Sequence, residues 1–152
     1  MNLVVNPGDA MSSGGTLTVE DRPAQKIGEG NEVILVVEDE SSVRSLVITV
    51  LRRARYRILS ATTGDEAIQL AAEHDGPIHL LLTDMSMPGM RGDQLAQRLS
   101  DTRPNLKLLI MSGNADALVA ASSELAARTP FLPKPFTPAA LTGSVRAALD
   151  SP

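Results

Sequence analysis

The centre of the sequence reads Leu80-Leu81-Leu82-Thr83-Asp84-Met85-Ser86-Met87-Pro88-Gly89. A short apolar run bounded by turn residues is typical of a strand that is buried on both faces, as in a parallel sheet. The run ends in one carboxylate, Asp84, and a Pro-Gly pair then breaks the chain into a loop. Because ligands of open α/β sheets bind outside the carboxyl ends of the strands, we expect Asp84 to belong to a functional site.

Apolar strand patterns alternate with helical patterns on both sides of this stretch. They predict strands over 33–37, 56–61, 78–83, 106–111 and 131–132. They predict helices over 41–54, 64–74, 93–100, 115–127 and 138–149, with N-caps at Ser41 or Ser42, Thr63 and Thr137. Alternating strands and helices imply parallel pairing with right-handed crossovers. We therefore expect a doubly wound α/β fold: a five-stranded parallel sheet with helices on both faces.

The composition excludes several classes of protein. The chain has 152 residues, 43% of them hydrophobic, which is enough to bury a core. It has no cysteine, so disulfides, thiol chemistry and cysteine zinc sites are excluded. A net charge of −4 argues against nucleic-acid binding. No apolar run approaches the roughly 20 residues of a membrane span, and no signal peptide is visible, so we expect a cytoplasmic protein without membrane or nucleic-acid partners.

Residues 1–31 differ in composition from the remainder. Turn pairs such as Pro7-Gly8 and Gly14-Gly15 interrupt any helical pattern there. We expect two parts: an N-terminal tail or linker over 1–31 and a folded domain over 32–150.

Polar side chains follow four of the predicted strands. They are Glu38-Asp39, Asp84, Ser112 and Lys134. The carboxyl ends of parallel strands share one edge of the sheet, so these groups should converge. Three carboxylates repel one another there, and a hard divalent cation such as Mg²⁺ relieves the repulsion. With a lysine and a hydroxyl beside it, such a site is equipped to form an acyl phosphate on the protein itself.

Each of these residues also has a purely structural interpretation. Asp84 alone could be a turn or cap residue, and Lys134 alone an exposed surface lysine. Glu38-Asp39-Glu40 could cap the helix that follows it. His74 and His79 lack the surroundings of a phosphorylated histidine and are interpreted as structural or surface residues.

In combination, the motifs resemble those of the receiver domain of two-component signalling, of the hybrid histidine-kinase type, over about 32–149. The family's motifs occur in order: Glu38-Asp39, Asp84 with Met87-Pro88-Gly89, Ser112, and Lys134-Pro135-Phe136. The resemblance implies a flavodoxin-like receiver fold.

The resemblance also implies roles for the acidic residues. Asp84 is the phosphoacceptor and takes the phosphoryl group from a phosphohistidine. Asp39 ligates Mg²⁺ directly, Glu38 ligates it through water, and Ser86 offers its backbone carbonyl. Asp84 also belongs to the set of metal ligands. No other cofactor is implied.

For the remaining motif residues, the resemblance implies a conformational response. Ser112 moves to hold the phosphoryl group, Lys134 pairs with it, and the Lys134-Pro135 peptide bond is cis. Phe131 falls at the aromatic switch position, where it lacks the hydroxyl of a tyrosine. Ser86 and Asn114 occupy the two variable positions that tune dephosphorylation.

A second, shorter resemblance lies at the N-terminus. Asn2-Leu3-Val4-Val5-Asn6 and Asp9-Ala10-Met11 resemble the N-box region of a histidine-kinase ATPase domain. Pro7-Gly8 departs from that pattern and the Gly-rich nucleotide boxes are missing. The likeness implies a remnant of a kinase module that does not bind ATP.

The leading hypothesis is a receiver without an attached output domain, which promotes its own phosphorylation and dephosphorylation but is not otherwise an enzyme. Its implied partner is a histidine kinase or histidine phosphotransferase, with homodimerisation as a further possibility. One alternative is a Mg²⁺-dependent phosphatase with an aspartyl-phosphate intermediate, although Ser86 replaces the second Asp that such enzymes use. Another is an interaction module that works without phosphorylation.

Overall fold

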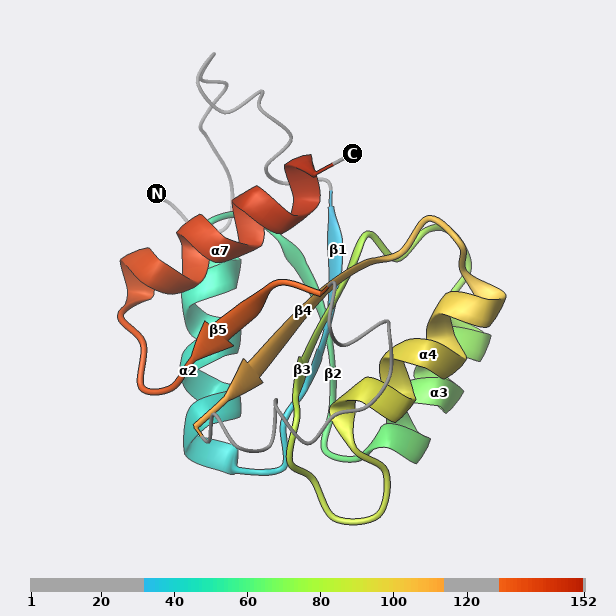
Figure 1. Cartoon of the computed structure of the whole chain (residues 1–152). Helices are drawn as coiled ribbons and strands as arrows, with labels where there is room; N and C mark the ends of the chain where they lie inside the picture. The colour runs from blue at the N-terminus through green and yellow to red at the C-terminus, as the bar shows by residue number, and fades with distance from the viewer. Residues whose placement is uncertain (1–31, 114–128, 152) are drawn as a thin grey trace. The chain divides into compact units, whose positions relative to one another are not determined.

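A five-stranded parallel sheet forms the centre of the domain that the structure describes (Figure 1). The computed structural model describes residues 32–113 and 129–151. The strands are β1 (Val33–Val37), β2 (Arg57–Ala61), β3 (Leu80–Asp84), β4 (Lys107–Ser112) and β5 (Phe131–Pro133). Their order in the sheet is β2-β1-β3-β4-β5, and every pair is parallel. The predicted five-stranded parallel sheet is therefore confirmed.

Helices cover both faces of the sheet (Figure 1). The described helices are α2 (Ser41–Arg53), α3 (Gly64–Glu73), α4 (Gly92–Thr102) and α7 (Pro138–Asp150). The first and last of these, α2 and α7, lie on one face, and α3 and α4 lie on the other. This arrangement confirms the doubly wound fold. No helix within 32–113 or 129–151 is long and apolar enough to cross a membrane.

Strand β1 contributes side chains to the hydrophobic clusters on both faces of the sheet. Val33, Leu35 and Val37 pack into the cluster beneath α3 and α4. The alternate residues, Ile34 and Val36, pack into the cluster beneath α2 and α7. Successive side chains of a strand point to opposite faces, so a central strand with helices on both sides must be apolar at every position. Burial on both faces therefore explains why the central strands appear in the sequence as continuous apolar runs.

The strand register aligns the carboxyl ends of the strands. Val37 pairs with Thr83, so Glu38 follows beside Asp84. Asp84 pairs with Met111, and Ser112 pairs with Pro133, the residue before Lys134. Four distant parts of the chain therefore reach one edge of the sheet, which we call the carboxyl edge.

Two predicted helix caps are confirmed and one is wrong. The Thr63 hydroxyl accepts a hydrogen bond from the Glu66 N–H, and the Thr137 hydroxyl accepts one from the Ala140 N–H. Helix α2, however, is preceded by Glu40 as N-cap, without a side-chain cap bond, so Ser41 and Ser42 already lie within the helix.

Several predicted boundaries are displaced. Strand β3 begins at Leu80 rather than at residue 78 and includes Asp84. Helix α4 runs from Gly92 to Thr102, longer than the predicted 93–100. The predicted helix over 115–127 and the N-terminal part over 1–31 lie outside the described residues.

Arg146 ties the last helix to the amino edge of the sheet, where the strands begin. Its guanidinium lies 3.0 Å from the Glu32 carboxylate, just before β1, and 2.9 Å from the Asp150 carboxylate. It also donates a hydrogen bond to the Tyr56 hydroxyl, at 3.3 Å. Arg146 therefore joins three elements that are distant in sequence.

Arg103, just after α4, makes a similar link on the other face. Its guanidinium donates to the backbone carbonyls of Ala71, His74 and Gly76, at 2.8, 3.2 and 3.0 Å. The last carbonyls of a helix have no partner within the helix. One arginine thus satisfies the end of α3 and fastens it to α4.

We predict that Arg103→Ala lowers the free energy of unfolding by about 1–3 kcal/mol, because carbonyls paired with a charged donor lose that partner. Urea unfolding followed by circular dichroism measures the change. Arg98→Ala, on the exposed surface of α4, is the matched control and should stay within about 0.5 kcal/mol of the wild type. Equal effects of the two substitutions would show that the link contributes nothing specific.

Candidate functional site

The end of β1 turns one carboxylate inward and leaves the next one exposed. Glu38 is 1% exposed, whereas Asp39 lies on the surface. The Glu38 carboxylate accepts a hydrogen bond from the Glu40 N–H, at 3.1 Å. The Arg44 guanidinium donates to the Glu38 carbonyl, at 2.8 Å, and so fixes the turn into α2. The Glu38 side chain therefore faces the interior of the site. Of the acidic run Glu38-Asp39-Glu40, it is Glu40 that occupies the N-cap of α2, without a side-chain cap bond.

The end of β3 holds Asp84 in place through its backbone and its side chain. Asp84 is 5% exposed, and its carboxylate accepts a hydrogen bond from the Ser86 N–H. Its carbonyl accepts a bond from the Thr83 hydroxyl, at 3.0 Å. The next N–H, of Met85, donates to the Met111 carbonyl on β4. Asp84 is therefore a buried carboxylate at a fixed position on the carboxyl edge.

Lys134 joins the two buried carboxylates. Its Nζ lies 2.8 Å from Glu38 Oε1 and 3.2 Å from Asp84 Oδ1. The Lys134 N–H donates to the carbonyl of Ser112, the buried last residue of β4. The Lys134–Pro135 peptide bond is cis, as predicted. The structure thus brings residues from β1, β3, β4 and β5 together, and Lys134 is not a simple surface lysine.

Burial dominates the electrostatics of this cluster. It raises the pKa of Glu38 and of Asp84, and the hydrogen bonds and charge of Lys134 oppose this rise without cancelling it. Burial also lowers the pKa of Lys134, but its hydrogen bond to Glu38 and the charge of Asp84 outweigh this, so the net pKa is raised. The cluster therefore carries an excess of poorly solvated negative charge.

The three carboxylates fit a hard divalent cation. Glu38, Asp39 and Asp84 each offer an oxygen, and these oxygens all lie within 4.8 Å of one another. Carboxylate oxygens are the ligands that hard cations prefer, and two of the three side chains are already withdrawn from solvent. A bound cation would offset the negative charge that Lys134 leaves uncompensated.

The remaining predicted residues surround this cluster. Ser86 is exposed in the β3–α4 loop, two residues after Asp84. Phe131 is half-buried at the start of β5, where it pairs with Ile110 of β4. Asn114 lies outside the described residues.

Sequence reasoning missed the role of Gly92. A Cβ atom at this position would overlap the Asp84 carbonyl oxygen and would lie 3.0 Å from both Asp84 C and Met85 Cα. The Gly92 N–H also donates to the Met85 carbonyl, at 2.9 Å. The only hint in the sequence is a glycine at the start of a predicted helix.

We predict that Gly92→Ala destabilises the protein by about 1–3 kcal/mol, because the added methyl group must displace backbone beside Asp84. Gly143→Ala is the matched control, since nothing lies within 4 Å of a Cβ at that position in α7. That control should stabilise the protein by about 0.5–1 kcal/mol, as expected in a helix interior. Urea unfolding of both variants checks this, and a neutral Gly92→Ala would contradict the close contact.

We also predict that Asp84→Asn stabilises the protein at neutral pH in the presence of a chelator. The pKa of Asp84 is raised by folding, so stability falls as pH rises from the ordinary aspartate pKa through the raised value. The Asp84→Asn variant does not lose this unfolding free energy, because its side chain does not ionise. Its higher stability relative to the wild type should therefore disappear at pH values below the ordinary aspartate pKa. Unfolding curves across pH measure it, with the exposed Asp101→Asn as control. A variant less stable than the wild type at neutral pH would refute the prediction.

Comparison with known proteins gives a consistent result. A family model described as the response regulator receiver domain matches residues 34–146. The sensor kinase CckA of Brucella abortus (strain 2308) is 33% identical over 121 residues, which cover 80% of this chain and 13% of that protein. The response regulator receiver protein CpdR of the same organism is 33% identical over 103 residues, 68% of this chain and 84% of CpdR.

Solved structures agree with this match. The crystal structure of the receiver domain from the hybrid histidine kinase CckA aligns with a TM-score of 0.65 and 33% identity, covering 78% of this chain and 99% of that one. The chain thus spans about an eighth of the length of the CckA kinase but most of the length of CpdR. On its fold, its carboxyl-edge cluster and these matches, the chain belongs to the response regulator receiver domain family of two-component signalling.

Proposed function

We propose that this receiver accepts a phosphoryl group on Asp84 from the phosphohistidine of a histidine kinase or histidine phosphotransferase. The main support for the proposal is the position of Lys134 Nζ, which lies within 3.2 Å of a carboxylate oxygen of both Glu38 and Asp84. A buried carboxylate beside a cation and two further carboxylates is an unfavourable arrangement for stability alone. It is favourable for a site in which a metal cation and a phosphoryl group complete the charge balance.

In the proposed reaction, an Asp84 carboxylate oxygen attacks the phosphorus atom. The new O–P bond forms as the P–N bond to the donor imidazole breaks, and the imidazole leaves with the bonding electron pair and takes up a proton. Lys134 balances the negative charge of the transferred group. The Ser86 N–H, which already donates to the Asp84 carboxylate, orients the attacking group.

The acidic cluster supports Mg²⁺ as the cation. Asp39 and Asp84 would hold it directly, Glu38 through a water molecule, and Ser86 through its backbone carbonyl. When bound, Mg²⁺ would stabilise the charge that develops on the phosphoryl oxygens. Mg²⁺ suits such a site because it needs only a few protein oxygens and keeps some of its waters.

Phosphorylation would then shift the protein between two conformations. The phosphoryl oxygens compete with Glu38 for Lys134 and attract the Ser112 hydroxyl. Movement of the β4 end reaches Phe131 through the β4–β5 pairing of Ile110 with Phe131. Phe131 therefore remains the proposed switch residue.

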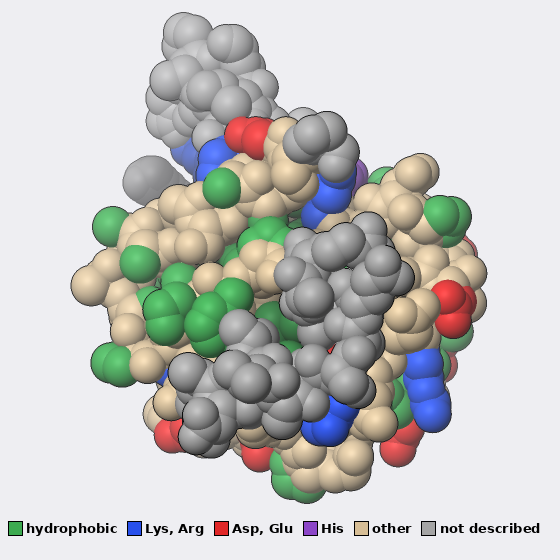
Figure 2. All heavy atoms as spheres, in the orientation of Figure 1, with side chains coloured by type: hydrophobic (Ala, Val, Ile, Leu, Met, Phe, Trp, Pro, Cys, Tyr) green, Lys and Arg blue, Asp and Glu red, His purple; other side chains and the backbone are tan. Residues whose placement is uncertain are grey.

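An apolar part of the described surface is a candidate for self-association. Hydrophobic side chains gather on the face over β5 and α7 (Figure 2). Homodimerisation through this face stays a prediction.

Two expectations for the N-terminus also stay predictions. They are the division of the chain at residue 31 and the kinase remnant within residues 1–31.

The test is intact-mass analysis after incubation with acetyl phosphate and Mg²⁺. We expect the full chain to gain one labile phosphoryl group, and Asp84→Asn and a chelator-treated sample to gain none. Asp101→Asn should react like the wild type, because that aspartate lies exposed on α4. A phosphohistidine donor protein then separates a need for a protein donor from failure of the proposal.

The same samples distinguish the alternatives. A phosphatase would turn over a phosphomonoester, which a receiver should not do. An interaction module would stay unmodified with both phosphoryl donors while remaining folded, and this result would overturn the proposed function.

A further inference from the structure

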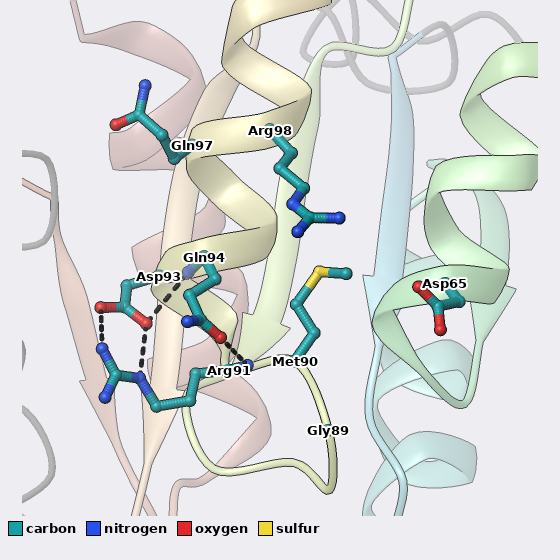
Figure 3. Close-up of a pocket in the computed structure, with 8 residues that line it drawn as sticks. All are labelled: Asp65, Gly89, Met90, Arg91, Asp93, Gln94, Gln97 and Arg98. Carbon is teal, nitrogen blue, oxygen red and sulfur yellow. Dashed lines mark hydrogen bonds and ion pairs between the residues drawn. The ribbon is translucent and has the colours of Figure 1, made fainter.

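A cleft surrounds the start of α4 and reaches α3 (Figure 3). Its volume is about 660 Å³, and most of its lining side chains are polar or charged. They are Asp65 of α3, the loop residues Gly89, Met90 and Arg91, and Asp93, Gln94, Gln97 and Arg98 of α4. Met90 and Arg98 extend toward α3 (Figure 3). A Cβ on Gly64 would lie 2.8 Å from Met90 Sδ, so Met90 packs directly on the start of α3 and forms an apolar floor.

A second hollow continues along the same two helices. Its volume is about 410 Å³, and it is lined mainly by Ile68, Ala72 and Leu99, with Arg98 again at its border. Arg98 belongs to both hollows, so together they form one groove between α3 and α4. We call it the α3–α4 groove. It is mostly polar at the start of α4, apart from Met90, and mostly apolar farther along, between Ile68, Ala72 and Leu99. Arg98 lies at the border between these two parts.

In the part of the chain that the structure describes, Arg98 differs from its neighbouring arginines in having no hydrogen-bond or ion-pair partner. Arg91 makes a two-pronged ion pair with Asp93, and Arg103 donates to three carbonyls. Within residues 32–113 and 129–151, Arg98 makes no hydrogen bond or ion pair, and it is exposed. Among these residues its guanidinium is thus an exposed, unpaired cation at the border of the polar and the apolar hollow.

Asp65, the acidic residue on the opposite side of the groove, does not neutralise Arg98. Asp65 lies in the first turn of α3, where the positive end of the helix dipole stabilises a carboxylate. Arg98 lies in the middle of α4, where the dipole gives no such compensation. Of these two charged residues, Arg98 is therefore the one that a bound anion would stabilise more.

We propose that the α3–α4 groove binds a short amphipathic helix of a partner protein that presents an acidic side chain next to apolar ones. The apolar residues would pack on Met90, Ile68 and Ala72, and the carboxylate would pair with Arg98. A groove between two helices suits a third helix, whose apolar face is read at i, i+3 and i+4 spacing. The groove lies outside the carboxyl-edge cluster, and binding there does not require Asp84 to be phosphorylated.

The test uses a displayed library of helical peptides about three turns long, with fixed leucines at i and i+4 and the other positions varied. The library is selected against the full chain. We expect the selected peptides to be enriched in Asp or Glu at one position beside the leucines. A two-dimensional spectrum of methionine methyl groups should show the Met90 signal shifting when such a peptide is added.

Charge-reversal variants decide whether Arg98 is the contact. Arg98→Glu should weaken a selected peptide at least about tenfold, as expected for a charge pair at an interface. A peptide with Lys in place of the selected acid should recover binding to Arg98→Glu. Ala72→Gln, which fills the apolar part from an exposed helix position, should also weaken binding. Arg52→Glu on α2 is the matched control and should change nothing.

Three results would overturn the proposal: no enrichment in acidic residues, equal binding to Arg98→Glu and wild type, or a Met90 signal that does not shift. The experiment is repeated with the Asp84→Asn variant, which should bind the selected peptide as tightly as the wild type does. A failure of phosphorylation at Asp84 would therefore leave this result unaffected, and the two proposals stand or fall separately.

Discussion

The site depends on the burial of carboxylates that one lysine cannot neutralise. Glu38 and Asp84 are almost fully withdrawn from solvent, and Asp39 lies within reach of both. Loss of hydration is the largest influence on both buried carboxyl groups, and it exceeds the effect of Lys134. A protein selected for stability alone would avoid such a cluster. In the proposed function, this excess negative charge would favour the binding of a cation, and the cation would in turn favour the binding of a phosphoryl group.

The parallel sheet is what makes this concentration of charge possible. Central strands with helices on both faces bury every side chain along their length, so β1 and β3 have no freedom to slip in register. The residue that follows each strand is therefore placed as accurately as the strand itself. Close backbone packing adds to this accuracy, since Gly92 leaves no space between the start of α4 and the Asp84 carbonyl. The packing of the apolar side chains on both faces of the sheet thus holds the charged residues in place.

The fold and most of the site were predictable from the sequence because both depend on local patterns and chain order. Apolar runs reveal buried strands, and polar residues at their ends meet wherever the strands are parallel. The predicted Ser41 or Ser42 cap failed because the turn before α2 is fixed by a tertiary demand, the inward position of Glu38, and not by local capping. Gly92, Arg103 and Arg98 were not predictable, because their roles depend on which atoms lie opposite them across two elements.

The long-range side-chain links of the described residues are concentrated at the amino edge of the sheet, away from Asp84. Arg146 joins α7 to Glu32 and Tyr56, and Arg103 joins the ends of α3 and α4 there. The His79 ring accepts a bond from the Val33 N–H, where β1 begins. At the carboxyl edge, by contrast, Lys134 itself provides the link between β5 and the acidic residues of β1 and β3. A change of charge at Asp84 can therefore rearrange the loops of the carboxyl edge while the opposite edge keeps the helices fastened, which is the mechanical requirement for a switch that does not unfold its own domain.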